Sequence, residues 1–111
     1  MRFRRMTALV AGMSGLVLGV VAEGVTATPD AARQQQLLHL LKQDCGSCHG
    51  MTLQGGLGPD LLSSRLAALP REFLVTTIAK GRPGTPMPPW ETLLSADDIG
   101  WLVDELQRGV E

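Results

Sequence analysis

The feature that most constrains this 111-residue chain is the stretch DCGSCHGMTLQGGLGPD, residues 44 to 60. It contains both cysteines of the sequence, Cys45 and Cys48, and one of its two histidines, His49, directly after them. A glycine-rich segment follows. Four kinds of site use two cysteines so close together: a redox-active dithiol, part of a zinc site, a structural disulfide and a covalent haem attachment. Each makes a different demand on the rest of the chain.

The first three kinds of site fit the rest of the sequence poorly. A zinc site needs a second pair of Cys or His residues, and only His49 and His39 remain, with His39 among polar residues at helical spacing. A thioredoxin-like dithiol is expected at a strand-to-helix turn, but no strand pattern precedes Cys45. A disulfide between Cys45 and Cys48 would close too small a loop to restrain the unfolded chain much. The dithiol and the disulfide also leave His49 unexplained.

The pattern Cys-x-x-Cys-His is typical of c-type haem attachment. Two thiols one helical turn apart can add to the two vinyl groups on one edge of the porphyrin, and the next residue then places its imidazole under the iron. The sequence therefore predicts one covalently bound haem c, attached at Cys45 and Cys48, with His49 as an iron ligand. The glycines between residues 55 and 58 predict a structured turn beneath the haem, in which the carbonyl of Pro59 accepts a hydrogen bond from His49.

The second axial ligand decides what such an iron centre can do, because an open position permits gas binding or catalysis and a filled one favours electron transfer. Met87 is the candidate. It lies in RPGTPMPPW, residues 82 to 90, where four prolines stiffen the chain far enough downstream to reach the other face of the ring. Three other potential ligands are less suited by their positions along the chain: Met51, His39 and Lys80.

The rest of the sequence predicts an all-α domain with about three main helices wrapped around the haem. Helical patterns run from about Pro29 to Asp44 with Thr28 as the cap, from Pro70 to Lys80, and from a capping box at Ser95 to Gly109. Residues 61 to 69 are expected to hold a turn or two of helix. No segment shows the two-residue alternation of a strand.

Gly100 lies inside the third predicted helix, where a glycine costs about 1 kcal/mol relative to alanine. We therefore expect the backbone of another helix to approach it closely, with Trp101 filling the adjacent space.

Residues 1–27 predict a secretory signal peptide, and residues 28–111 the domain that binds the haem. The cationic start MRFRR, a mostly apolar run over residues 6 to 22 and the small residues before Thr28 are the three parts of such a signal. The alternative, a retained membrane anchor, requires the apolar run to span a membrane at the lower limit of length. Cleavage would remove three of ten basic and one of eleven acidic residues and leave a net charge of −3, which argues against nucleic acid or an anionic membrane as partner.

CGSCH at residues 45 to 49, the turn at Gly58-Pro59, Met87-Pro88 and the final helix together resemble a class I monohaem cytochrome c. More narrowly, GGLGPDL and KGRPGTPMPPW are similar to the small periplasmic cytochrome associated with the denitrification nitrite reductase that carries haem c and haem d (the NirC type). The resemblance implies thioether bonds at both cysteines, His49 and Met87 as axial ligands, Pro59 as the carbonyl partner of His49, and crossed first and last helices.

The narrower resemblance implies a periplasmic electron carrier, not an enzyme, that passes single electrons through a His/Met-ligated haem c. Its redox partner would be a dissimilatory nitrite reductase or an upstream electron donor. We expect a monomer that is not bound to a membrane after signal cleavage. The alternative is a maturation factor for the haem d of that reductase; a ligand-binding haem sensor is less favoured.

Overall fold

The computed structural model describes residue 19 and residues 27–110, and the helices over this part of the chain confirm the all-α prediction, with no strand among them. The predicted signal peptide lies outside the described residues, apart from residues 19 and 27. In the portion described, no helix is long and apolar enough to cross a membrane. The helical elements are α1 (Ala31–Leu40), η1 (Leu41–Cys45), α2 (Gly46–His49), α3 (Ser63–Leu66), α4 (Arg71–Lys80) and α5 (Ala96–Arg108).

The first three elements form one continuous helical segment, longer at its end than the sequence predicted. The predicted cap was wrong: Asp30, rather than Thr28, caps α1, because its side chain accepts a hydrogen bond from the Arg33 N–H at 2.8 Å. The central element η1 is a π-helical turn, in which the Gly46 N–H donates to the carbonyl of Leu41. The segment therefore carries the cysteines and His49 on its last turns.

The other two main helices begin and end where the sequence predicted. Helix α4 lies between Pro70 and Gly81, and α5 begins with a capping box in which Ser95 and Asp98 bond each other's backbone N–H groups. Gly109 ends α5. The short helix α3 accounts for the turn of helix expected between residues 61 and 69.

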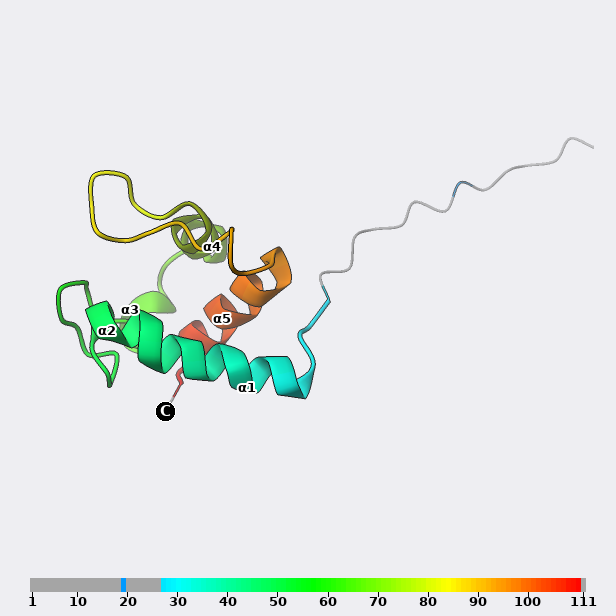
Figure 1. Cartoon of the computed structure of the whole chain (residues 1–111), viewed down its shortest axis with the longest axis horizontal. Helices are drawn as coiled ribbons and strands as arrows, with labels where there is room; N and C mark the ends of the chain where they lie inside the picture. The colour runs from blue at the N-terminus through cyan, green and yellow to red at the C-terminus, as the bar shows by residue number, and fades with distance from the viewer. Residues whose placement is uncertain (1–18, 20–26, 111) are drawn as a thin grey trace, which may run out of the picture.

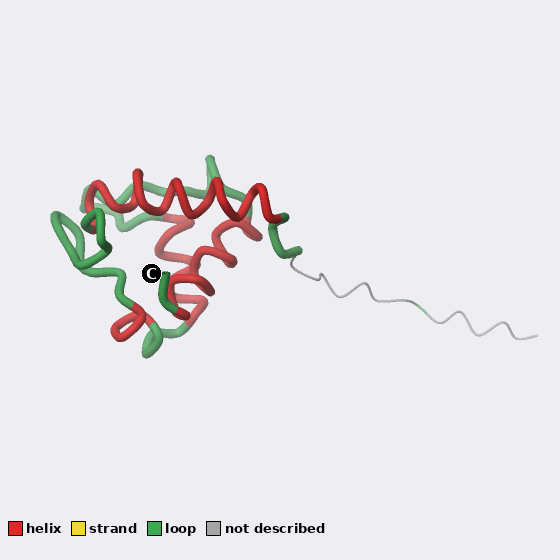
Figure 2. The backbone as a smooth tube through the Cα atoms, turned by 90° about the horizontal axis from the view of Figure 1, so that it is seen from below, coloured by secondary structure: helices red, strands yellow, loops and turns green. Residues whose placement is uncertain are grey.

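The three main helices pack around one apolar core, with α5 contacting α1, α3 and α4 (Figures 1 and 2). The apolar stripe predicted for α5 is buried, including Ile99, Leu102 and Leu106. The buried core cluster consists of Leu37, Leu41, Leu53, Leu66, Leu94, Ile99, Leu102 and Leu106. The loop after α2 and the loop after α4 extend on the same side of the molecule in Figure 1. This arrangement brings the attachment motif and the proline-rich segment to one end of the fold.

Two bidentate ion pairs tie the helices together. Arg33 of α1 binds the buried Asp98 of α5, with Nη2–Oδ2 at 2.7 Å and Nε–Oδ1 at 3.2 Å. Arg71 of α4 binds Asp104 of α5 in the same way, at 2.6 and 3.1 Å. Hydrogen bonds from each arginine lower the pKa of its aspartate partner below the ordinary value. The α1–α5 and α4–α5 contacts are thus each held by a charged clamp as well as by apolar packing.

The close neighbour of Gly100 is a side chain, which corrects the expectation of a helix backbone. A Cβ on Gly100 would lie 2.8 Å from Nη2 of Arg71, and no backbone atom of another helix is among its nearest neighbours. The glycine therefore leaves room for the Arg71 guanidinium, which crosses α5 to reach Asp104. Trp101 is partly buried beside the same small hollow, next to residues 27 to 29.

Candidate functional site

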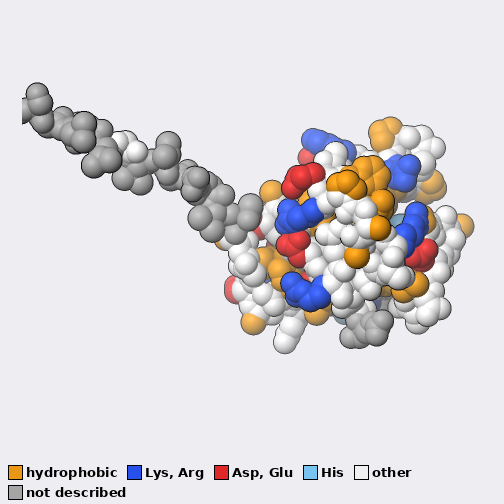
Figure 3. All heavy atoms as spheres, turned by 180° about the vertical axis from the view of Figure 1, so that it is seen from behind, with side chains coloured by type: hydrophobic (Ala, Val, Ile, Leu, Met, Phe, Trp, Pro, Cys, Tyr) orange, Lys and Arg blue, Asp and Glu red, His pale blue; other side chains and the backbone are white. Residues whose placement is uncertain are grey.

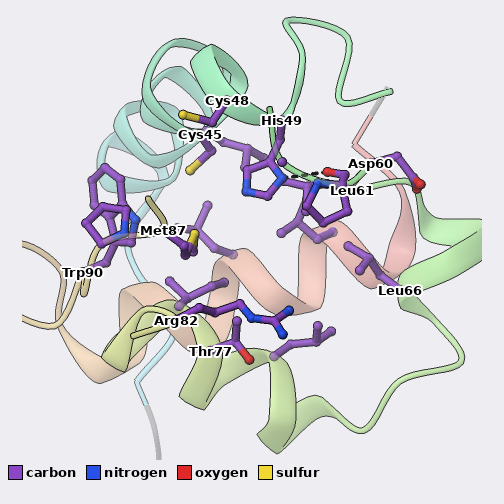
Figure 4. A pocket seen from close by; sticks show the side chains of 18 of the residues that line it. Cys45, Cys48, His49, Asp60, Leu61, Leu66, Thr77, Arg82, Met87 and Trp90 are labelled. Atoms are coloured by element: carbon purple, nitrogen blue, oxygen red, sulfur yellow. Dashed lines mark hydrogen bonds between the residues drawn. The ribbon is translucent and has the colours of Figure 1, made fainter. Parts of the chain in front are cut away.

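A largely apolar cavity of about 350 Å³ lies between the attachment motif, α4 and the loop after α4 (Figure 4). Cys45, Cys48 and His49 form part of its lining, and Met87 enters from the loop after α4. The face predicted for α4 also lines it, through Phe73, Leu74, Thr77 and Ile78. Residues from distant parts of the sequence thus meet around one space.

The two thiols are both half-buried and face this cavity. Burial, together with the adjacent Asp44 carboxylate, raises the pKa of the Cys45 thiol to about 11. Cys45 is therefore a neutral thiol at physiological pH before it reacts. Because α2 is helical between them, the two sulfurs project from the same end of the helix, as attachment to one edge of a porphyrin requires.

His49 is held in one orientation by a hydrogen bond. Its Nδ1 lies 2.7 Å from the backbone carbonyl oxygen of Pro59, which is the contact expected from the sequence (dashed in Figure 4). A carbonyl can only accept, so Nδ1 carries the proton and Nε2 retains its lone pair. The imidazole is therefore prepared to act as a ligand through Nε2.

The glycine-rich loop after α2 is hydrogen-bonded directly to the attachment motif. The Gly55 N–H donates to the His49 carbonyl at 2.7 Å, and the Gly58 N–H donates to the Cys48 carbonyl at 2.8 Å. A Cβ on Gly58 would lie 2.8 Å from Cε1 of His49, too close for any side chain. Glycine is needed there because the loop backbone packs against the imidazole ring.

The loop that carries Met87 is closed by its own backbone. The Arg82 N–H donates to the Met87 carbonyl at 3.1 Å, and the Trp90 N–H donates to the Ile78 carbonyl at 3.0 Å. Gly81 has a φ of 68°, and a Cβ there would lie 2.7 Å from the carbonyl oxygen of Met87. Met87 is half-buried, whereas the residues on either side of it are exposed. The loop thus directs one apolar side chain inward.

The three other potential ligands do not line the cavity. Met51 is 59% exposed, and His39 is exposed on α1, as its polar neighbours predicted. Lys80 pairs with Glu91, with Nζ–Oε2 at 2.8 Å. Of the sulfur and nitrogen ligands that sequence reasoning considered beyond the motif, only Met87 is within reach of the same space as His49.

Two basic residues of the cavity were given no role by sequence reasoning. Arg65 and Arg82 both line the space; arginine is not an iron ligand, and Arg82 entered only as part of the KGRPGTPMPPW segment. The available signal for Arg82 was its place in the Met87 segment, directly after the glycine that ends α4. For Arg65 no local signal existed, because α3 is too short to show a helical pattern.

The residues present fit a covalently bound haem. Two thiols and an oriented imidazole lie at one wall of an apolar cavity, a thioether enters from a separate loop, and Gly58 leaves the histidine ring the space it occupies. A hydrophobic space with two sulfur attachment points and an N/S donor pair has the composition of a c-type haem site.

Comparisons with known proteins give the same answer. The family model for cytochrome c oxidase, cbb3-type, subunit III matches residues 32–104. Cytochrome c55X of Pseudomonas aeruginosa is 65% identical over 81 residues, which cover 73% of this chain and 68% of that protein. The solved structure of the c-type cytochrome NirC is 66% identical with a TM-score of 0.70, covering 72% of this chain and 94% of that one.

A more distant similarity is to the dihydro-heme d1 dehydrogenase of Pseudomonas aeruginosa. It is 37% identical over 73 residues, which cover 66% of this chain but only 13% of that protein.

The fold and the site define a monohaem c-type cytochrome, with haem c bound covalently through Cys45 and Cys48. Within that class, the chain belongs to the cytochrome c55X or NirC type. Cytochromes c of this kind are electron carriers.

Proposed function

We propose that this protein is a periplasmic carrier of single electrons in which His49 and Met87 are the two axial ligands. The observation that carries the proposal is that both side chains reach into one cavity from separately fastened loops (Figure 4). When bound, the haem iron supplies a one-electron couple, and thioether ligation favours a higher reduction potential than a second imidazole would.

The chain's part in electron transfer is to keep both ligands in place. Pro59 fixes the tautomer and direction of His49, and the Arg82–Met87 backbone bond closes the methionine loop. A ligand set that moves little when the iron changes charge allows rapid transfer. If His49 and Met87 both bound the iron, exogenous gases and substrates would have no site on the metal, as a carrier rather than a sensor requires.

The proposed partner is the dissimilatory nitrite reductase of denitrification, or a donor upstream of it. The high identity to NirC and cytochrome c55X supports this, as does the predicted signal peptide over residues 1–27, which would place the mature domain in the periplasm. Basic and acidic side chains lie beside one another on the face in Figure 3, with hydrophobic side chains between them. We infer a transient docking interface around the loop 84–89, whose residues other than Met87 are exposed, with apolar contacts at its centre.

Two measurements test the carrier role. Intact mass of the exported protein should show one haem added and residues 1–27 removed. Stopped-flow mixing of the reduced protein with oxidised nitrite reductase should show electron transfer that is faster at low ionic strength if charges steer the encounter. A colourless exported protein, or reduced protein that does not react with the reductase or with any periplasmic donor, would contradict the proposal.

A second candidate, maturation of haem d, is favoured by one specific observation. A domain similar to this chain forms part of the dihydro-heme d1 dehydrogenase, so related domains occur in a protein that acts on that haem. Deleting the gene separates the two roles. A nitrite reductase that contains haem d but receives electrons slowly indicates donation, whereas a reductase without haem d indicates maturation.

A further inference from the structure

The charged side chains that line the cavity are unequally partnered. They are Asp44, Asp60, Arg65 and Arg82. Arg65 is paired with Asp60, since its Nη1 lies 3.6 Å from Oδ2 and donates to the Asp60 carbonyl at 3.2 Å. The guanidinium of Arg82 has no carboxylate or hydrogen-bond partner among the described residues. Arg82 is exposed, so it places a positive charge without an ion pair at the edge of the cavity, and Asp44, beside the attachment motif, has no ion pair among the described residues either.

The backbone of Arg82 is fixed, although its side chain has no partner. Its N–H donates to the Met87 carbonyl, and its own carbonyl accepts from the Thr85 N–H at 3.0 Å and the Thr85 hydroxyl at 2.7 Å. These bonds make Arg82 the base of the methionine loop. From there the side chain extends into the cavity on the side away from Cys45 and Cys48 (Figure 4).

The position of Arg82 relative to the cysteines matches the chemistry of haem. The vinyl groups that form the thioether bonds are on one edge of the porphyrin, and the two propionates are on the opposite edge. A guanidinium across the cavity from both cysteines is therefore on the propionate side. Arginine binds carboxylates through parallel N–H···O bonds, and a charge at the edge of an apolar space is stabilised by such a partner.

We propose that Arg82 binds the haem propionates and so joins the Met87 loop to the cofactor edge. The proposal rests on the function proposed above, in which Met87 faces the iron. Arg82 is then a positioning residue with two effects. Its salt bridge holds the base of the loop against the haem, and its positive charge disfavours the ferric state, which raises the reduction potential.

The test compares Arg82→Gln, Arg82→Lys and Lys42→Gln in the holoprotein. Lys42 is the matched control, because it is an exposed basic residue without an ion pair in the described structure and lies outside the cavity. Redox titration at a fixed potential should show that the ratio of oxidised to reduced protein is about three- to tenfold higher in Arg82→Gln than in the wild type. For a one-electron couple, tenfold corresponds to about 59 mV in reduction potential. Arg82→Lys should recover most of this shift, and Lys42→Gln should show less than a twofold change.

Resonance Raman spectroscopy separates pairing from a role in loop shape. In Arg82→Gln, the propionate bending band should shift in the Raman spectrum, while the charge-transfer band from Met87 to ferric iron persists in the visible absorption spectrum. An unchanged propionate band, with a potential like that of Lys42→Gln, would overturn the proposal. Loss of the methionine band in both Arg82 variants without a propionate shift would also overturn it, since the residue would then only shape the loop.

Failure of the proposed ligation is visible separately. A wild-type protein without the methionine band would contradict Met87 as ligand, and the propionate band would still decide the role of Arg82. If Arg82→Gln gives too little holoprotein, the wild-type ferrous protein decides. Nuclear Overhauser contacts between the Arg82 guanidinium and the propionate methylenes are expected, and their absence would overturn the proposal.

Discussion

The two loops that meet at the cavity each fix one side chain there, but they do so in opposite ways. The glycine-rich loop after α2 removes side chains, so that its backbone can bond the carbonyls of Cys48 and His49 and pack on the imidazole. The proline-rich loop after α4 removes backbone freedom and presents one side chain, Met87. The His49 side chain is held by close contact along its ring, and the Met87 side chain by a stiff backbone. The comparison suggests that the two should fail differently when altered.

The largest expected effect comes from removing the haem attachment, because both loops border the haem cavity. Replacing Cys45 and Cys48 together by alanine removes the covalent haem, around which both loops are arranged. A small domain whose cavity is apolar and open should then lose its cooperative fold. Circular dichroism during thermal unfolding, with haem staining, measures this. A stable, cooperative transition in the haem-free variant would show that the two loops fold without the haem between them.

Met87→Ala breaks the proline-rich loop alone. It should open the iron, abolish the charge-transfer band from methionine to ferric iron, lower the reduction potential and allow rapid binding of carbon monoxide to the reduced protein. The bond between His49 and Pro59 should remain, because it belongs to the other loop. An unchanged ferric spectrum would reject Met87 as a ligand.

Gly58→Ala and Gly84→Ala compare the loops through one added methyl group each. At Gly58 the methyl group would meet the His49 ring, so we expect about 1–3 kcal/mol of destabilisation and shifted NMR signals from the His49 ring. At Gly84 there is open space but a φ of 81°, so about 1–2 kcal/mol of backbone strain is expected with those signals unchanged. Chemical denaturation and proton NMR spectra check both variants. His49 ring signals that moved equally in the two variants would remove the distinction between the loops.

The smallest expected effect concerns the helices that support both loops. Arg33 lowers the pKa of the Asp98 carboxylate in the fold, so the folded state binds a proton there less readily than the unfolded state. This contribution to stability is complete above pH about 4, the ordinary aspartate value, and is lost as the pH falls through the lowered pKa. Asp98→Asn should therefore flatten the loss of stability in acid. Asp104→Asn, at a more exposed pair, should do so less. Denaturant midpoints between pH 2 and 6 give the measurement.

The sequence was most informative where one local rule determines the structure. The capping box at Ser95, the glycine after α4 and the apolar stripe of α5 fixed their helices because each depends on neighbouring residues only. The attachment motif likewise identified Cys45 and Cys48 without any knowledge of the fold. The ligand roles of His49 and Met87 stay predictions, although the fold brings both residues to the cavity.

Features that depend on distant residues were beyond sequence reasoning. The pairing of Arg33 with Asp98 joins residues 65 apart in the chain, and Arg71 reaches Asp104 over Gly100 from another helix. The cap of α1 was misplaced because Thr28, Pro29 and Asp30 all favour a helix start, and only the structure shows which oxygen meets the Arg33 N–H.

The wide turn η1 sets the angle at which the haem-binding residues leave the helix. A regular helix turns by about 100° for each residue, so one residue more or fewer before Cys45 would rotate the sulfurs and the imidazole away from the space they now share. The five residues Leu41–Cys45 thus set the rotation of the attachment motif in α2 relative to α1, which packs on the leucine core. Transplanting the CGSCH motif onto another helix would require the phase to be matched as well as the spacing.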